Sequence, residues 1–518
     1  ESQLLGSQND MATIRLGDIM KLNYKKTIFV GFAFFLISAF WQAYDTIIPK
    51  ILTDKFGMSQ SLSGVIMAAD NVLALFLLPL FGSLSDKCKS RRGRRTPFII
   101  TGTICAAVLF VVLSFADDLQ LRALAPVAVD NPTAQETLWD ADLTATTPDG
   151  VEFEVQEEFT REEFASIEMT EADGSANPDY TNYVVPARQA YAAEATANNH
   201  GPLIFFVAVL LLVLVSMATF RSPAVALMPD VTIKPLRSKA NAVINLMGAA
   251  GGIIVLGLGA VFGTGKAENA LMSYTLFFTA ISALMLVSLV IFLWRVKEPQ
   301  LVHEMHEESH RYGIATEEDA DPNSGDRKLS KGEFKSLILI LMSVVFWFFG
   351  YNAVTSKYAV YASSVLDLDY NLTLMIATGA AIVAYLPVGA LASRIGRRKT
   401  ILIGIVILGG SFLAASFIRA GSPVMVMNLL FATAGIGWAT INVNSYPMVV
   451  ELSRGGDVGK YTGFYYTASM AAQTLTPIIS GFLMDTLGMT ALFPYGAVFV
   501  LLAFVTMLFV KHGDNKPT

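Results

Sequence analysis

The chain has 518 residues, of which 53% are hydrophobic and 15% are charged, and its formal net charge is −6. An average soluble domain carries about 25% charged residues, so this composition argues against a soluble enzyme. The two cysteines, Cys88 and Cys105, fall in a predicted loop and a predicted helix, so we expect the fold to hold together without a disulfide.

Long apolar runs recur along the whole chain. Each is close to the roughly 20 residues that an α-helix needs to cross about 30 Å of hydrocarbon. Because lipid offers the backbone no hydrogen-bond partners, these runs should be helices rather than strands. The sequence therefore predicts an all-α membrane protein with twelve transmembrane helices, at about 27–49, 62–82, 96–116, 202–228, 240–263, 270–294, 336–358, 371–391, 400–418, 424–446, 460–483 and 490–510.

Basic residues gather in alternate loops between these runs. Short cytoplasmic loops retain Lys and Arg, and one side collects Lys21, Lys25 and Lys26 as well as the clusters at 87–95 and 394–399. Both termini are therefore predicted to be cytoplasmic, in a multi-pass protein of the cell membrane. The first run is too long for the apolar core of a signal peptide, so we expect it to stay in the mature protein.

A polar segment at 117–200, on the external side between the third and fourth runs, has eighteen acidic residues against three arginines. Alternation at 151–155 predicts a short strand, and 160–166 predicts a helix with Glu162 and Glu163 in its first turn. A small folded cap and a mostly disordered acidic loop both remain open.

A second polar segment, 298–335, separates six runs from six. His303, His306 and His310 have a spacing that could bind a metal if this segment were helical, whereas a solvated charged linker needs no metal, and we predict none. The predicted organisation is a cytoplasmic tail (1–26), an N-terminal six-helix bundle (27–116 and 201–297) interrupted by the external insertion (117–200), a cytoplasmic linker (298–335), a C-terminal six-helix bundle (336–511) and a cytoplasmic tail (512–518).

The loops after the second and the eighth runs carry the same pattern of a glycine followed by a basic cluster. The residues are Gly82, Asp86, Arg94 and Arg95 in the first loop, and Gly389, Arg397 and Arg398 in the second. Ser393 stands where the first loop has Asp86. Such a duplication implies two pseudo-symmetric six-helix bundles around an axis along the membrane normal, with a solute site between them near mid-membrane.

This doubled loop resembles the signature of the major facilitator superfamily, which is glycine, aspartate, a basic residue and then Gly-Arg-Arg. The resemblance implies a conformational latch, in which Asp86 meets the positive N-terminal end of the eleventh helix near Gly459 and Lys460 in only one of two rocking states. Gly82 should let the second helix approach a neighbour closely. The predicted latch residues are Gly82, Asp86, Arg94, Arg95, Gly389, Arg397 and Arg398.

A closer resemblance appears when the first loop is followed through 85–99, which is similar to the extended form found in plant sucrose carriers and their bacterial and animal relatives, the glycoside–cation symporters. Residues of two further regions also match that family: Pro223, Ala226, Leu227, Asp230, Arg237, Ala240, Asn241 and Ala242, and then Trp438, Asn442, Asn444, Tyr446, Pro447 and Glu451. Two departures count against sucrose itself as the solute. Val225 replaces an arginine of the plant carriers, although Arg221 lies four residues earlier on the same helix face. No histidine stands in the first external loop.

Ionisable residues inside the membrane are costly and therefore suggest function. Asp70 should lie near mid-membrane and is our first candidate for ion coupling, either by carrying a proton or by holding Na⁺ together with Asn71. Arg221 in the fourth helix is the natural counter-charge. The alternative is that Asp70 serves only packing. No organic cofactor or metal is predicted, and the coupling ion is H⁺ or, alternatively, Na⁺.

Sugars present apolar faces ringed by hydroxyl groups, so aromatic rings together with carboxylate and amide groups suit a sugar site. The candidate substrate-binding residues are Trp41, Gln42, Asp45, Asn245, Trp347, Asn352, Trp438 and Asn442. For each aromatic residue the alternative is a role as an interfacial anchor. Lys357, near the outer end of the seventh helix, is interpreted as a side chain that reaches to water.

Together these features favour a monomeric, proton-coupled importer of a sugar or glycoside, such as a disaccharide (sucrose or maltose), whose partners are the solute, the ion and the lipid bilayer, with no nucleic acid. The alternatives are a Na⁺-coupled or other-solute carrier, including an exporter, and a non-transporting receptor or scaffold whose acidic external segment binds a partner. We do not expect an enzyme, because no nucleotide loop and no nucleophile with a base can be recognised.

Overall fold

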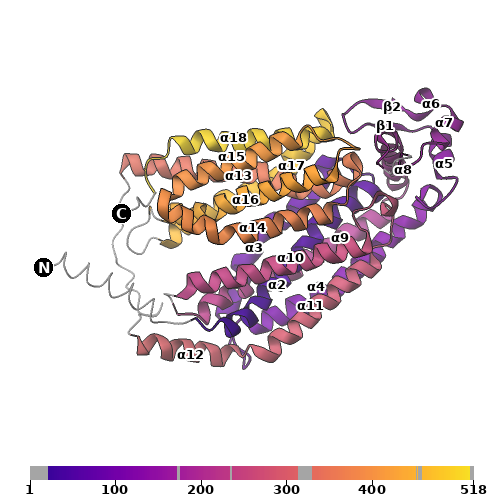
Figure 1. Cartoon of the computed structure of the whole chain (residues 1–518). Coiled ribbons are helices and arrows are strands. Elements are labelled where there is room, and N and C mark those ends of the chain that lie inside the picture. The colour runs from indigo at the N-terminus through magenta and orange to yellow at the C-terminus, as the bar shows by residue number, and fades with distance from the viewer. Residues whose placement is uncertain are drawn as a thin grey trace.

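Helices dominate the part of the chain that the computed structural model describes, which is residues 22–171, 175–233, 236–312, 330–450, 452 and 458–513 (Figure 1). All twelve predicted apolar runs fall on helices. Within the described residues, ten helices are long and apolar enough to cross a membrane, and the apolar part of α14, Tyr370–Tyr385, is shorter.

The helices form two halves in chain order. The N-terminal half contains α2 (Tyr24–Lys50), α3 (Gln60–Asp86), α4 (Thr96–Leu124), α9 (Gly201–Asp230), α10 (Arg237–Phe262) and α11 (Thr275–Arg295). The C-terminal half contains α13 (Lys331–Tyr361), α14 (Tyr370–Ile395), α15 (Arg397–Ala415), α16 (Val424–Val450), α17 (Val458–Leu487) and α18 (Leu492–Leu508). Each half has its own cluster of buried apolar residues. The halves meet where α3 packs on α17, α10 on α14 and α2 on α13.

Several of these helices begin at a polar residue that caps them. Ser59 accepts a hydrogen bond from the backbone of Leu62 at the start of α3, and Asp369 accepts one from Asn371 at the start of α14. Ser330 and Glu333 form a reciprocal capping box at the start of α13. These caps satisfy backbone N–H groups that have no partner within the helix, so short polar sequences fix where the apolar helices begin.

Residues 125–198, between α4 and α9, form a small folded unit, which we call the 125–198 unit. Its elements are η2 (Ala125–Val127), α5 (Ala134–Asp140), β1 (Thr144–Thr146), β2 (Glu152–Glu154), α6 (Val155–Glu158), α7 (Arg161–Ala165), η3 (Tyr180–Val184) and α8 (Val185–Asn198). The two strands pair antiparallel, with Ala145 opposite Phe153, and both side chains join a separate apolar core. The predicted strand and helix are confirmed, and the alternative of a mostly disordered loop is wrong for the described residues.

The helix predicted at 160–166 owes its start to a capping box. Thr160 accepts a hydrogen bond from the backbone of Glu163, and the Glu163 carboxylate accepts from the backbone and the hydroxyl of Thr160. The bond from the Thr160 hydroxyl lowers the pKa of the Glu163 carboxyl, because it stabilises the ionised form.

The 125–198 unit contacts both halves at the same end of the helices, which we call the unit end. On the N-terminal half, Gln189 donates to the carboxylate of Asp54 at 2.9 Å. On the C-terminal half, the loop between β1 and β2 meets η8 (Met489–Ala491), where the Thr490 backbone donates to the carbonyl of Pro148 at 3.3 Å and its hydroxyl to Asp149 at 3.0 Å.

Helix α12 (Glu298–Arg311) lies at the opposite end, which we call the α12 end (Figure 1). It occupies the first part of the predicted linker, whereas 313–329, like 1–21 and 514–518, lies outside the described residues. The exposed His303 side chain pairs with Glu307 at 3.2 Å. In the described part of the chain, no group of three or more His, Cys, Asp or Glu residues is arranged to hold a metal ion.

Candidate functional site

A cavity of about 160 Å³ lies between the two halves, deep among the helices. Helices α2, α3 and α9 of the N-terminal half contribute Trp41, Tyr44, Asp45, Met67, Asp70, Asn71 and Arg221, and α13 and α17 of the C-terminal half contribute Asn352, Thr355, Ser356, Gln473 and Pro477. Asp70 lies ten residues after Gln60, the first residue of α3, which is about 15 Å along the helix axis. The structure thus brings charged side chains from three apolar helices to one place.

Three charged residues share this cavity without forming a direct ion pair. Asp70 accepts a hydrogen bond from the Asn71 side chain at 2.8 Å. The guanidinium of Arg221 lies 5.2 Å from the centre of the Trp41 ring. Among the described residues, no ion pair of 4.0 Å or shorter joins Arg221 to Asp70 or to Asp45. The guanidinium is therefore held against an aromatic face, beside two carboxylates that it could approach.

Three of the lining residues carry a buried polar atom that has no hydrogen-bond partner among the described residues. These atoms are Nε1 of Trp41, the hydroxyl oxygen of Tyr44 and Nδ2 of Asn352. Buried polar groups are nearly always paired, and an unpaired one costs about 1 to 3 kcal/mol. All three groups can donate a hydrogen bond. Their convergence on one cavity, from both halves, suits a ligand that offers several oxygen acceptors.

The structure places the predicted ion-coupling residues Asp70, Asn71 and Arg221 together in this cavity, but it separates the predicted substrate-binding residues. Of the latter, only Trp41, Asp45 and Asn352 line it. The other five lie elsewhere, as follows. Trp347 is fully buried in the core of the C-terminal half, Trp438 stacks on Tyr351 at 3.7 Å, Gln42 packs beside Gly252, Asn245 is exposed, and Asn442 lies beside Tyr385.

Helical geometry explains the misplaced tryptophan and the lining residues that sequence reasoning missed. Trp347 is five positions from Asn352, which puts it about 140° around the helix and away from the cavity. Thr355 and Ser356 lie three and four positions after Asn352, on the same face. Gln473 lies four positions before Pro477 on α17. Polar residues three and four positions apart within an apolar helix lie on one face, and this spacing could have identified them in the sequence.

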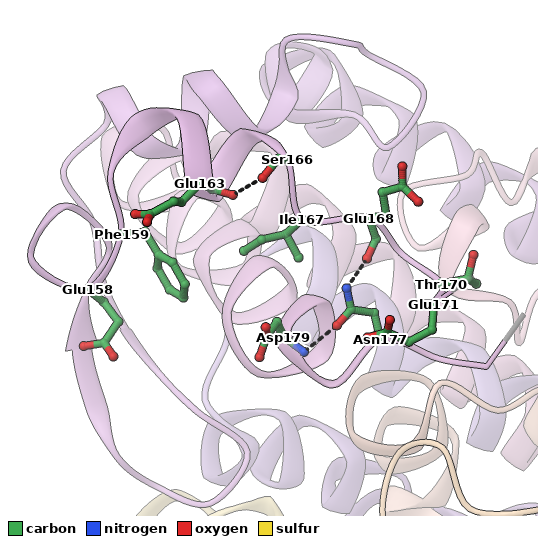
Figure 2. Close-up of a pocket in the computed structure, with 10 residues that line it drawn as sticks. All are labelled: Glu158, Phe159, Glu163, Ser166, Ile167, Glu168, Thr170, Glu171, Asn177 and Asp179. Atoms are coloured by element: carbon green, nitrogen blue, oxygen red, sulfur yellow. Dashed lines mark hydrogen bonds between the residues drawn. The ribbon is translucent and has the colours of Figure 1, made fainter. Parts of the chain in front are cut away.

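A larger hollow, about 640 Å³, is an open groove in the 125–198 unit (Figure 2). Its acidic lining residues are Glu158, Glu163, Glu168, Glu171 and Asp179. Figure 2 shows hydrogen bonds among the residues of this groove, as when Asn177 donates to the carbonyl of Glu168 at 2.8 Å. We place the functional site in the smaller cavity because, unlike this groove, it combines buried charges with unpaired donors from both halves.

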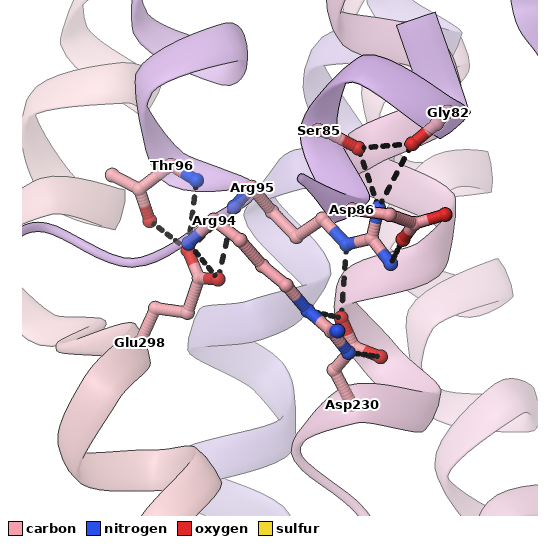
Figure 3. Close-up of polar contacts among 8 residues, drawn as sticks. All are labelled: Gly82, Ser85, Asp86, Arg94, Arg95, Thr96, Asp230 and Glu298. Carbon is pink, nitrogen blue, oxygen red and sulfur yellow. Dashed lines mark hydrogen bonds and ion pairs between the residues drawn. The ribbon is translucent and has the colours of Figure 1, made fainter. Parts of the chain in front are cut away.

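A network of ion pairs joins the predicted latch loop to α9 at the α12 end (Figure 3). Arg95 pairs with Asp86 at 2.5 Å and with Asp230, the last residue of α9, at 2.9 Å. Arg94 pairs with the other oxygen of Asp230 at 2.7 Å. All four residues belong to the N-terminal half, so in this state Asp86 contacts an arginine of its own half.

Glu298, at the start of α12, caps the N-terminus of α4 in the same region (Figure 3). Its carboxylate accepts from the backbone N–H groups of Arg94, Arg95 and Thr96, at 2.8, 2.9 and 2.7 Å, and from the Thr96 hydroxyl at 2.7 Å. A carboxylate at a helix N-terminus meets unpaired donors and the positive end of the helix dipole. Sequence reasoning placed Glu298 only at the boundary of a linker and missed this role.

The remaining latch residues have mixed outcomes. A Cβ atom on Gly82 would lie 2.8 Å from the Ser222 hydroxyl oxygen, so the predicted close approach is confirmed, with α9 as the neighbour. Arg398 donates to the carbonyl of Leu508 at 2.6 Å, at the C-terminal end of α18, which favours a cation. For Gly459 and Lys460, the predicted partners of Asp86, and for Gly389, the structure describes the helical backbone only. Arg397 makes an interaction with another residue.

The cap by Glu298 leads to a prediction about stability. Glu298→Ala should lower the free energy of unfolding in detergent by about 3 kcal/mol, because several N–H groups lose a charged acceptor. Glu304→Ala is the matched control, since Glu304 is exposed and, among the described residues, pairs with Lys26 at 3.0 Å, and it should cost less than about 1 kcal/mol. Equal losses in the two variants would show that the cap carries little energy.

The chain resembles known membrane transporters in parts of its sequence and in its fold. Residues 369–518 match the family model described as Major Facilitator Superfamily, and residues 29–123 match the model described as MFS/sugar transport protein. The sucrose transport protein SUT3 of Oryza sativa subsp. indica is 37% identical over 71 residues, 14% of this chain and 14% of that protein. The putative glycoside/cation symporter YagG of Escherichia coli (strain K12) is 29% identical over 82 residues, 16% of this chain and 18% of that protein.

These alignments are local, and the chain spans only 14% and 18% of the length of these two relatives. The fold likeness is much more extensive. The inward open conformation of the xylose transporter XylE from E. coli has a TM-score of 0.56 and covers 95% of this chain and 97% of that chain, at 15% identity. The predicted resemblance to the major facilitator superfamily, and within it to the sucrose and glycoside–cation symporters, is therefore confirmed, and the relatives and the fold are those of membrane transporters rather than of enzymes.

Proposed function

We propose that the chain is a secondary transporter that carries a sugar or glycoside together with a proton by alternating access. In this proposal α14 and α17 join the ten apolar helices as transmembrane spans, which gives twelve in two six-helix bundles. The 125–198 unit lies outside the cell, and both termini and α12 lie in the cytoplasm. The names of the relatives, a sucrose transport protein and a glycoside/cation symporter, support a sugar and a coupling cation.

The observation that carries the proposal is the set of unpaired donors in the cavity between the halves. A sugar has a hydroxyl or ether oxygen on nearly every carbon, so it can satisfy Trp41, Tyr44 and Asn352 at once. Asp45 can accept hydrogen bonds from the sugar hydroxyls, and the Trp41 ring offers a flat face to the apolar side of a sugar ring. Because the donors come from both halves, bound solute would join the two halves at mid-membrane.

Asp70 and Arg221 supply the coupling in this proposal. While Asp70 is ionised it attracts the Arg221 guanidinium, which shares the cavity with it. When Asp70 carries a proton that attraction is lost, and the guanidinium is free to donate to solute hydroxyls. Proton and solute therefore favour each other's binding, as a symporter requires.

The cavity of about 160 Å³ is smaller than the roughly 300 Å³ at which pockets for drug-sized ligands begin. The halves must therefore separate further to admit or release a disaccharide. The described polar contacts between the halves lie at the unit end, for example Thr264, two residues after the end of α10, with the Tyr370 hydroxyl of α14 at 2.9 Å. Movement of the halves about the cavity would break such contacts and close the α12 end instead.

A sodium-coupled carrier is the main competing function, and the geometry of Asn71 favours the proton. The Asn71 amide nitrogen donates to Asp70, so the amide oxygen, which would have to hold Na⁺ beside the carboxylate, is turned away from it. Counterflow and uptake of labelled mono- and disaccharides into proteoliposomes, under an imposed pH gradient or an imposed Na⁺ gradient, separates these functions. If only the Na⁺ gradient drives uptake, Na⁺ replaces H⁺ as the coupling ion. Sugar binding without any transport would favour a receptor.

A pair of tyrosine variants tests where the solute binds. Tyr44→Phe should raise the apparent Kd for the transported sugar about tenfold, because one hydrogen bond to the solute is lost. Tyr495→Phe is the matched control, since its buried hydroxyl is also unpaired but lies on α18, away from the cavity. It should leave the Kd unchanged. If both variants bind the sugar as the wild type does, the Tyr44 hydroxyl is not part of the solute site.

A further inference from the structure

At the unit end, a carboxylate of the C-terminal half caps a helix of the N-terminal half. Asp485, near the end of α17, accepts hydrogen bonds from the backbone N–H groups of Gln60 at 2.7 Å and Ser61 at 2.8 Å, and a further one from the Ser61 hydroxyl. Gln60 and Ser61 are the first two residues of α3. Their N–H groups have no acceptor within the helix, so this carboxylate completes the N-terminus of α3 from across the boundary.

The backbones of the same two helices touch beside this cap. A Cβ atom on Gly64 of α3 would lie 2.1 Å from the carbonyl oxygen of Pro477, and one on Gly481 of α17 would lie 2.3 Å from the carbonyl oxygen of Gln60. Real Cβ atoms do not approach backbone this closely, so only glycine allows this contact. We call these residues, Gln60, Ser61, Gly64, Pro477, Gly481 and Asp485, the α3–α17 seam.

A buried cation strengthens the seam. Lys357 of α13 has no exposed surface and donates to the carbonyl oxygen of Gln60 at 2.7 Å. Its interpretation as a side chain that reaches to water is therefore wrong, because the ammonium group is held between the halves. The backbone of Gln60 thus gives its N–H to Asp485 and its carbonyl to Lys357, both from the C-terminal half.

We propose that Asp485 holds the transporter closed at the unit end, so that it is a positioning residue that sets the balance between the two states of the transport cycle. The inference rests on the proposed alternating access. The cap joins opposite halves, so opening at this end must break it and expose the N–H groups of α3 to water. The state shown here is therefore favoured by charge-assisted hydrogen bonds that the other state lacks.

The test measures how often the seam opens. In a background without Cys88 and Cys105, Ser63→Cys places a thiol at a fully buried position, one turn into α3, whose hydroxyl has no partner. A membrane-impermeant maleimide is added on the side of the 125–198 unit. Asp485→Asn should raise the labelling rate at least about tenfold, the equivalent of about 1.4 kcal/mol. Gly481→Ala should raise it too, because the added Cβ pushes the helices apart.

Two controls decide how the result is interpreted. Glu268→Gln removes a charge at the unit end from an exposed ion pair with Lys266, and it should leave labelling unchanged. A thiol at Ser343, buried within the C-terminal half, should stay protected in Asp485→Asn. Unchanged labelling at Ser63→Cys in Asp485→Asn overturns the inference, whatever Gly481→Ala does. Faster labelling at Ser343→Cys also overturns it, because it would indicate general loosening. Labelling does not depend on which solute is carried, so a failure of sugar uptake alone would count only against the proposed function.

Discussion

Asp70→Asn should abolish proton-driven accumulation of the solute while counterflow exchange continues. The amide resembles the protonated carboxyl group in shape and lacks its charge, so the solute can still bind and the halves can still move. No proton can be released, however, and the gradient is no longer coupled to the solute. In proteoliposomes with an imposed pH gradient, the accumulation ratio of the labelled sugar should fall to about one, its value at equilibrium without coupling.

The matched control for this variant is Asp118→Asn. Asp118 lies outside the cavity and accepts hydrogen bonds from Ser273 and Thr275 at 2.7 and 2.9 Å. It undergoes the same chemical change and should keep accumulation. If Asp70→Asn still concentrates the sugar, Asp70 is not the coupling group and Asp45 becomes the next residue to test.

Arg221 should tolerate no conservative replacement if its planar fork contacts both a carboxylate and the solute. Lysine keeps the charge but has a single ammonium group, so Arg221→Lys should lose most transport. The measurement is the initial rate of uptake at saturating and at low sugar concentration. If the lysine variant transports at the wild-type rate, the positive charge of Arg221 matters and its planar shape does not.

The helices and the charged part of the site could be predicted from the sequence, for a physical reason. A span needs about 20 apolar residues and excludes unpaired charge. The helices, and exceptions such as Asp70 and Arg221, can therefore be recognised in the sequence alone. Which way an aromatic residue faces is set by packing between helices. Trp347 therefore looked like a site residue although it fills the core of its half.

Contacts between residues far apart in the chain could not be predicted in the same way. Asp485 meets Gln60 across 425 positions and Glu298 meets Thr96 across 202. Neither acid belongs to a periodic pattern, and each acts by capping a helix that begins elsewhere in the chain. The order of the 125–198 unit has a similar origin, because its few apolar side chains suffice only once they share one core.

The buried ion pair between Lys55 and Asp117 should have the largest effect on stability. The ammonium and carboxylate groups lie 2.6 Å apart, and neither side chain is exposed. Lys55 also donates to the carbonyl of Met272 at 2.6 Å and lies 4.3 Å from the centre of the Tyr274 ring. Asp117→Ala leaves a buried, uncompensated ammonium group, so we expect a loss of about 3 to 5 kcal/mol in the free energy of unfolding.

Two further variants separate the energy of the pair from the penalty of an unpaired charge. Replacing both partners by apolar residues, Lys55→Met with Asp117→Leu, should recover most of the loss, because no charge is then buried. Glu268→Ala breaks the exposed pair with Lys266, whose charged atoms lie 3.0 Å apart, and should cost less than about 1 kcal/mol. Unfolding in detergent, followed by circular dichroism, measures all three. A double variant as unstable as Asp117→Ala would mean that the ion pair itself stabilises the contact between α4 and η1 (Ile51–Lys55), the π-helical turn that follows α2.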